Sequence, residues 1–122
     1  MANGITDNNG KTIQVKTKYF IHNAPSKALI KSTVHLNGRY GCNYCNVEGT
    51  YDGRMIFLHT GTQRTDKTFR KKSQKNHHKY TSVLETLEVD IMQQFPLEIM
   101  HCVDLGCTKK LLLIWKEGPL PL

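Results

Sequence analysis

Hydrophobic and polar residues alternate between Thr12 and Ile21. The apolar or β-favouring positions are Ile13, Val15, Thr17, Tyr19 and Ile21, with Gln14, Lys16 and Lys18 between them. A period of two residues is typical of a half-buried strand, so this pattern predicts a strand over Thr12–Ile21. A helix is expected directly afterwards, over Asn23–Val34, because Asn23 suits the N-cap and Pro25 suits the first turn.

Later stretches of the sequence predict a hairpin, a short basic helix and two longer helices. Asp52-Gly53 separates two β-favouring runs, which predicts a hairpin within residues 47–58. A short helix is expected to begin at Thr65 or Asp66. Apolar residues then recur at helical spacing in two stretches: Val83, Leu84, Leu87 and Ile91, then Val103, Cys107, Leu111 and Ile114. We expect Ser82 to cap the first helix. The second should be mostly buried, with Trp115 in the core, and end near Glu117-Gly118-Pro119.

Length and composition indicate a single domain. The chain has 122 residues, of which 39% are hydrophobic, and this is enough for a modest core. It has no run of about 18 apolar residues, and its N-terminus lacks the charged-then-apolar pattern of a secretion signal. We therefore expect an intracellular protein whose four cysteines are free or metal-bound rather than disulfide-linked. The absence of a P-loop and of a Gly-rich nucleophile turn argues against enzymes that use those motifs.

Positive charge is concentrated in residues 63–79. The net charge of the whole chain is +7, and this segment alone contributes +6, from seven basic residues and Asp66. A local field of this kind attracts polyanions, of which nucleic acid is the commonest inside cells. A solvated loop without a ligand is the alternative. The candidate nucleic-acid-binding residues are Arg64, Lys67, Arg70, Lys71, Lys72 and Lys75.

Two thiols lie three positions apart in Gly41-Cys42-Asn43-Tyr44-Cys45. A Cys-x-x-Cys turn directs both sulfur atoms towards one point, which suits a tetrahedral ion such as zinc. Zinc takes about four ligands, and no second Cys-x-x-Cys follows, so this turn supplies half of a site.

Five short motifs share an order and spacing that are typical of one protein family. They are Phe20-Ile21-His22-Asn23-Ala24-Pro25-Ser26-Lys27-Ala28, the cysteine turn, Arg64-Thr65-Asp66 with Phe69-Arg70, His77-His78-Lys79, and Phe95-Pro96-Leu97-Glu98-Ile99-Met100-His101. Together they resemble the central part of a transposase of the CACTA (En/Spm-like) group, or of the related transposase-derived proteins of animal genomes. The resemblance extends from Tyr19 to Gly118, and the chain would cover only a fraction of a full transposase.

The resemblance implies an RNase H-like core in which three carboxylates hold two Mg²⁺ ions that support DNA cleavage and joining. The family's second carboxylate is the Asp of an Asp-Ala-Pro motif, and Asn23 occupies that position here. A neutral amide cannot replace a carboxylate between two cations. The first acid would lie before Met1 and the third after Leu122. We therefore expect this chain alone to be inactive and to bind no magnesium.

The resemblance also implies zinc ligands between the second and third acids. Cys42 and Cys45 are the first pair, and His101 is a plausible third ligand. His78, or less favourably His77, is a further candidate, and Cys102 competes with His101 because the two are adjacent. A fourth ligand outside this chain is left open, as is a purely structural role for His101. Glu98 has either an auxiliary role near the active site or a structural role in orienting His101.

The expected fold class is α/β. We predict part of an RNase H-like fold with an inserted zinc-binding Cys-x-x-Cys turn and a short hairpin, followed by C-terminal helices. The segments are a flexible N-terminus (1–11) with a turn at Asp7-Asn8-Asn9-Gly10, a strand and helix of the RNase H-like core (12–40), the insertion with the basic segment (41–79), and a helical region (80–122). Because a buried helix would end the chain, we expect it to be a piece of a longer protein.

Two functions are consistent with these observations. The first is a fragment of a transposase-like protein whose ancestral role is DNA transposition and which is inactive alone. The alternative is a small zinc-stabilised module that binds nucleic acid or protein without catalysis. The expected partners are DNA and either the remaining transposase segments or a second copy of the chain, with no membrane and no small-molecule substrate. The resemblance implies a nuclear location.

Overall fold

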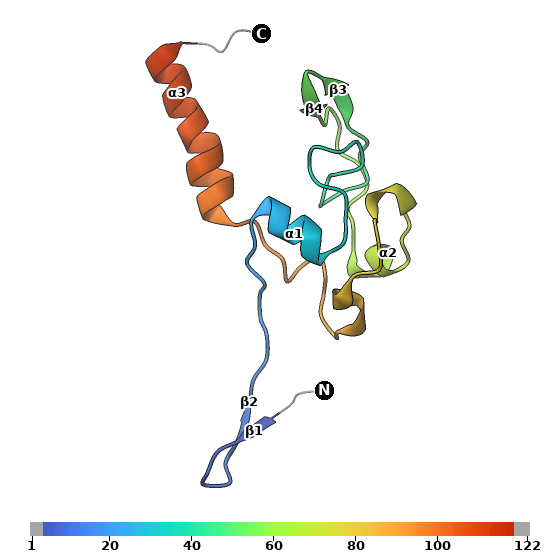
Figure 1. Ribbon diagram of the computed structural model, residues 1–122, viewed down its shortest axis with the longest axis vertical. Helices are drawn as coiled ribbons and strands as arrows, with labels where there is room; N and C mark the ends of the chain where they lie inside the picture. The colour runs from blue at the N-terminus through green and yellow to red at the C-terminus, as the bar shows by residue number, and fades with distance from the viewer. Residues whose placement is uncertain (1–3, 119–122) are drawn as a thin grey trace.

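A small hydrophobic core holds the centre of the molecule together. The computed structural model describes residues 4–118. Phe69, Leu84, Ile91 and Phe95 are each at most 1% exposed and form one cluster. Four partly buried side chains from distant parts of the sequence pack against it, namely Phe20, Ile30, Val89 and Met92. The core thus joins the region around the first helix to residues 69–95, while a hairpin and a long helix extend away from it (Figure 1).

The first helix, α1 (Ala24–Ile30), begins where the sequence predicts. Asn23 is its N-cap, its side-chain oxygen accepts a hydrogen bond from the Ser26 N–H at 3.0 Å, and Pro25 lies in the first turn. The helix ends earlier than the predicted Val34. Lys31 is the C-cap, and Ser32 has a φ of 53°, which turns the chain out of the helix.

The N-terminal region forms a two-stranded antiparallel hairpin. Strands β1 (Gly4–Thr6) and β2 (Thr12–Gln14) pair with Ile5 opposite Ile13. The predicted turn between them is confirmed, because the Asp7 carboxylate accepts the N–H groups of Asn9 and Lys11, each at 2.9 Å. The predicted strand over Thr12–Ile21 is confirmed only to Gln14. Residues 15–23 have no regular structure, since no other strand of the described chain lies beside them.

The hairpin around Asp52-Gly53 and the short basic helix are both confirmed. Strands β3 (Thr50–Asp52) and β4 (Arg54–Ile56) pair antiparallel, and Gly53 makes the turn with a φ of 65°. Helix α2 (Asp66–Arg70) begins after Thr65, whose side chain accepts the Thr68 N–H in a capping box.

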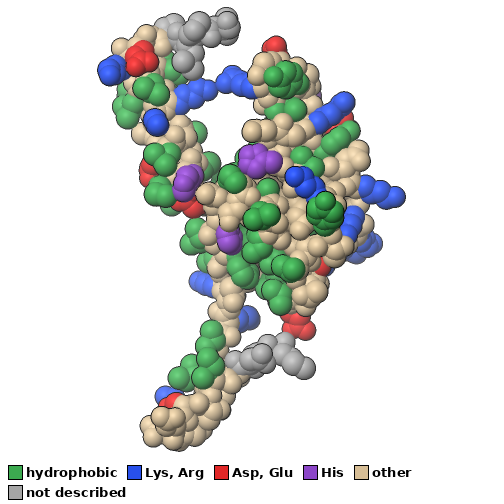
Figure 2. All heavy atoms as spheres, in the orientation of Figure 1, with side chains coloured by type: hydrophobic (Ala, Val, Ile, Leu, Met, Phe, Trp, Pro, Cys, Tyr) green, Lys and Arg blue, Asp and Glu red, His purple; other side chains and the backbone are tan. Residues whose placement is uncertain are grey.

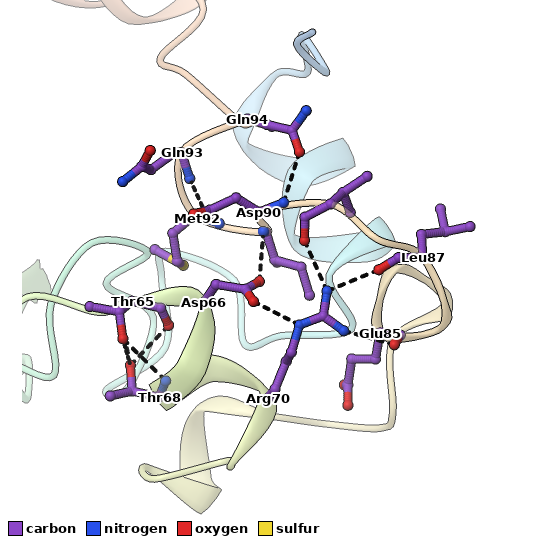
Figure 3. Close-up of polar contacts among 12 residues, drawn as sticks. Thr65, Asp66, Thr68, Arg70, Glu85, Leu87, Asp90, Met92, Gln93 and Gln94 are labelled. Carbon is purple, nitrogen blue, oxygen red and sulfur yellow. Dashed lines mark hydrogen bonds and ion pairs between the residues drawn. The ribbon is translucent and has the colours of Figure 1, made fainter. Parts of the chain in front are cut away.

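The predicted helix over Val83–Ile91 is wrong except for its cap. Two single turns of 3₁₀-helix lie in this part of the chain, η1 (Lys75–His77) and η2 (Val83–Thr86), and Ser82 caps η2. Leu84 and Ile91 are buried as the pattern requires, but Val83 and Leu87 are exposed. The backbone carbonyls of Glu85, Leu87 and Val89 accept hydrogen bonds from an arginine side chain, instead of from helical N–H groups (Figure 3).

The C-terminal helix is present but not buried. It consists of a π-helical stretch, η3 (Met100–Thr108), and α3 (Lys109–Glu117), and it ends at Gly118 with a φ of 87°, as predicted. None of the described residues of either stretch is buried, and Trp115 is 77% exposed. The prediction of a buried helix with Trp115 in the core is therefore wrong, because this helix leads away from the centre of the molecule (Figure 1).

The described chain combines short helices with two small antiparallel sheets. This confirms a mixed α and β structure at the level of general class, whereas the RNase H-like layer stays a prediction. Among residues 4–118, no helix has both the length and the apolar character that a membrane crossing requires.

Candidate functional site

The two thiols of the cysteine turn lie together. The Sγ atoms of Cys42 and Cys45 are 3.4 Å apart, and the Arg64 N–H donates to the Tyr44 carbonyl at 2.8 Å, which holds the turn against the following segment. Gly41 is required just before the turn. A Cβ atom there would lie only 2.1 Å from the His35 carbonyl oxygen, so no larger residue fits without a backbone shift.

The environment of Cys45 favours its thiolate. Partial burial raises the pKa of this thiol, but hydrogen bonds from the backbone N–H groups of Val47 and Gly61 oppose that effect. Together with a hydrogen bond from Cys42 and the positive charge of Arg64, they bring the pKa below its ordinary value. The thiolate is the form of cysteine that binds metal ions, so a lowered pKa at Cys45 is compatible with the predicted zinc site.

The cysteine pair fits two positions of a zinc site. Two Zn–S bonds of about 2.3 Å at the tetrahedral angle would place the sulfur atoms about 3.8 Å apart, close to the observed 3.4 Å. Within residues 4–118 no group of three or more His, Cys, Asp or Glu side chains is arranged to hold an ion, so the zinc site stays a prediction.

The histidines predicted as further ligands have different surroundings. Both ring nitrogens of His78 are buried and have no hydrogen-bond partner in the described chain. His77 is 1% exposed, and its Nδ1 donates to the Tyr40 carbonyl at 2.7 Å. His101 is instead held by Glu98, with 2.5 Å between Nδ1 and a carboxylate oxygen. Of these three rings, only that of His78 has no hydrogen bond in the described chain.

Glu98 orients the start of the C-terminal helix. Its carboxylate accepts the N–H groups of Met100 at 2.7 Å and His101 at 2.8 Å, in addition to the His101 ring contact. The backbone hydrogen bond from His101 is the main reason that the pKa of Glu98 lies below its usual value. This geometry is that of a capping residue that also positions His101.

The arginines and the lysines of the basic segment have different surroundings, and the arginines face inwards. Arg64 is 7% exposed; its Nε donates to the Cys42 carbonyl at 3.1 Å, and its guanidinium also contacts the Gln74 side chain. Burial lowers the pKa of Arg64, and the nearby thiols of Cys42 and Cys45 oppose this. Arg64 therefore links the thiol turn to the basic segment, and its guanidinium is buried and hydrogen-bonded inside the fold.

Arg70 joins α2 to the irregular segment that follows it (Figure 3). Its Nε lies 2.8 Å from the Asp66 carboxylate, and its other nitrogens donate to three carbonyls at 2.8, 3.0 and 2.9 Å, those of Glu85, Leu87 and Val89. The second oxygen of Asp66 accepts the Ile91 N–H at 2.9 Å. Arg70 and Asp66 together replace the backbone hydrogen bonds that the segment of residues 85–91 lacks.

The lysines of the same segment face outwards. Lys67, Lys71 and Lys75 are exposed, and their ammonium groups have no hydrogen bond or ion pair in the described chain. Lys72 is half-buried and donates to the Thr81 hydroxyl at 2.7 Å. Lys and Arg side chains project at the right-hand edge of the molecule in Figure 2, the side on which α2 lies in Figure 1. We call Lys67, Lys71 and Lys75 the lysine ridge.

Two lysines of α1 and its C-cap have roles that the sequence did not reveal. Lys27 is 3% exposed and donates to the carbonyls of Phe95 at 3.3 Å and Pro96 at 2.8 Å. Lys31 is 2% exposed, with its ammonium 4.8 Å from the centre of the Phe95 ring. Burial, aided by the charge of Lys27, lowers the pKa of Lys31 to about 8. Their spacing of four residues was the only signal that both share one helix face.

Comparison with known proteins gave no relationship to add to this geometry. No protein-family model, curated protein or solved structure matches the chain.

Proposed function

We propose that this chain is a non-catalytic nucleic-acid-binding piece of a transposase-like protein, with the lysine ridge as its phosphate-binding surface. The observation that carries the proposal is that the arginines and the lysines of the basic segment differ in their hydrogen bonds. Arg64 and Arg70 donate hydrogen bonds inside the fold, whereas the ammonium groups of the three ridge lysines have no partner among residues 4–118.

Free lysines on a fixed segment suit the phosphate backbone. Lys67 and Lys71 are four residues apart, so their side chains leave neighbouring positions on the surface of α2 and its C-cap. Each phosphate that a lysine neutralises releases a counterion, and binding through such contacts is strongly salt-dependent and independent of base sequence. The arginine hydrogen bonds reduce the entropy that the segment would lose on binding.

The position that resembles a catalytic acid supports a non-catalytic role. The Asn23 side-chain oxygen already accepts the Ser26 N–H, so its part in this chain is to cap α1. Within the proposal, DNA transposition is the ancestral activity of the longer protein, residues 12–40 derive from its RNase H-like layer, and the site of action is the nucleus.

The proposal includes one structural zinc ion at the cysteine turn. Cys42 and Cys45 would hold it, and His78 is the third ligand that we favour, because its ring nitrogens are buried without a partner. His101 is less favoured, since Glu98 already binds its ring. Bound zinc would supply a cross-link that stabilises the fold. The chain's own contribution is the thiolate environment at Cys45 and the link from Arg64 to the turn.

Binding of a labelled DNA duplex, measured by fluorescence anisotropy over a range of salt concentrations, tests the proposal. We expect Lys67→Ala to weaken binding, while the matched control Lys16→Ala, which removes one exposed charge elsewhere, leaves it unchanged. Equal effects of the two substitutions would contradict the proposed surface. The zinc content of the purified protein, with Cys42→Ser as the comparison, tests the ion separately, and a folded protein without zinc would remove it from the account.

A further inference from the structure

A hollow of about 220 Å³ lies where α1, the cysteine turn and the C-terminal helix meet. Its apolar walls include Ala24, Leu36 and Leu97, and its polar lining includes Asn43 and Tyr44 of the turn. Pockets for drug-sized ligands usually measure about 300–1,000 Å³, so this one is large enough for a single ring system and too small for a whole nucleotide.

Asn43 lines this hollow, and its amide oxygen has no hydrogen-bond partner in the described chain. The residue is only 5% exposed. A buried polar group without a partner destabilises a fold and is uncommon in native proteins. A buried amide oxygen without a partner beside an apolar hollow is therefore a candidate group for binding a ligand.

Tyr44 supplies a fixed aromatic wall beside the amide. Its hydroxyl oxygen lies 3.4 Å from the Lys27 ammonium, and Lys27 is itself held by the Phe95 and Pro96 carbonyls. Tyr44 is 40% exposed, so part of its surface is available for a stacking partner. Asn43 and Tyr44 are the two residues between Cys42 and Cys45, so a constraint on the two thiols also constrains the backbone of these two residues.

We infer that this hollow binds an adenine base, with Asn43 as the reading residue and Tyr44 as the stacking residue. An asparagine amide offers an acceptor and a donor that match the exocyclic amine and N7 of adenine, and every base can stack on an aromatic ring. The inference rests on the proposed function, because it names what the same nucleic-acid-binding protein recognises beyond phosphate.

The lining favours a base from a single strand over a free nucleotide. The basic side chains that line the hollow have partners inside the fold. Lys27 donates to two carbonyls, His101 contacts the Glu98 carboxylate, and His22 contacts the Ser26 hydroxyl. That carboxylate also lies at the hollow and repels phosphates. A base attached to a strand, whose phosphates remain outside, therefore suits this site better than a nucleoside triphosphate.

Two assays distinguish a base in a single strand from a free nucleotide. Fluorescence anisotropy compares single-stranded oligonucleotides that contain only adenine, only thymine or only cytosine, and competition with AMP tests the free nucleotide. We expect the wild type to bind the adenine oligomer about tenfold more tightly than the others, within the discrimination that one bidentate pair provides. Asn43→Leu should remove this preference, so that the adenine and thymine oligomers bind with equal affinity, whereas Lys67→Ala should weaken all oligomers equally. If AMP competes as well as the adenine oligomer does, the base comes from a free nucleotide. Equal binding of all oligomers by the wild type, or a preference that survives Asn43→Leu, overturns the inference.

A second readout does not depend on DNA binding. Cys102 lines the hollow, while Cys107 is exposed on the same helix outside it. Adenosine should slow alkylation of Cys102 by iodoacetamide and leave Cys107 unaffected, as followed by peptide mass spectrometry. Protection of Cys102 without salt-dependent DNA binding would retain the base site and contradict the proposed function. Identical labelling rates with and without adenosine would overturn the site, whatever the lysine ridge does.

Discussion

Replacing Arg70 with alanine should destabilise the fold without acting on nucleic acid directly. The guanidinium bonds to Asp66 and to three carbonyls, and its side chain is 30% exposed. A hydrogen bond to a charged group contributes about 1.5–3 kcal/mol, and partial exposure reduces the total. We expect Arg70→Ala to lower the free energy of unfolding by roughly 3–5 kcal/mol, a large part of what a small domain has.

Two matched substitutions sharpen this prediction. Lys67→Ala removes the same charge from the same helix but no hydrogen bond, so the free energy of unfolding should change by less than about 0.5 kcal/mol. Arg70→Lys keeps the charge, but one ammonium group cannot reach all four acceptors, and the loss should be roughly half that of alanine.

Urea denaturation followed by circular dichroism measures these differences, since a change in midpoint at constant slope reports stability. If Arg70→Ala leaves the midpoint unchanged and lowers DNA affinity as much as Lys67→Ala does, Arg70 is a phosphate ligand and the assigned division between arginines and lysines is wrong.

Three further predictions test other parts of the structure. Gly41→Ala should lower the free energy of unfolding by roughly 1–3 kcal/mol, because the new Cβ atom would clash with the His35 carbonyl. Gly53→Ala should lower it by less, because position 53 has open space and only its positive φ opposes alanine. Thermal melts of the two variants test this order. Burial lowers the pKa of His77 to about 4. The unfolded chain therefore takes up the proton first, and stability should fall by up to roughly 3 kcal/mol as pH drops from about 6.5 to 4; a His77→Gln variant that keeps the same pH slope refutes this. Asn43→Leu should raise the melting temperature, since it removes a buried amide oxygen that has no partner in the described chain, and a lower melting temperature would show that this oxygen is hydrogen-bonded.

Features encoded by a few neighbouring residues could be predicted from the sequence. Asn23, Thr65 and Ser82 each cap a helical turn through their own side chains, and Asp52-Gly53 makes a hairpin. The Cys-x-x-Cys spacing likewise predicts that the two thiols meet. Each of these depends on contacts within about four residues, so one stretch of sequence contains the whole signal.

Features that depend on distant contacts could not be predicted. The alternation up to Ile21 indicates a strand, but a strand needs a neighbour, and that neighbour is not encoded locally. Charge counting placed Arg70 with the lysines, whereas its acceptors are carbonyls 15 to 19 residues further along the chain. The helical pattern of the C-terminal residues gave the helix and its end but not whether anything covers it.

The salt dependence of DNA binding tests the central claim most directly. Two triple variants lower the net charge equally, from +7 to +4. One replaces the lysine ridge, Lys67, Lys71 and Lys75, with alanine, and the other replaces Lys109, Lys110 and Lys116 on α3. If the ridge binds phosphates, its loss should reduce the slope of log K against log salt by about 2.7 for duplex DNA, and the α3 variant should keep the wild-type slope. Equal slopes for the two variants would contradict the account.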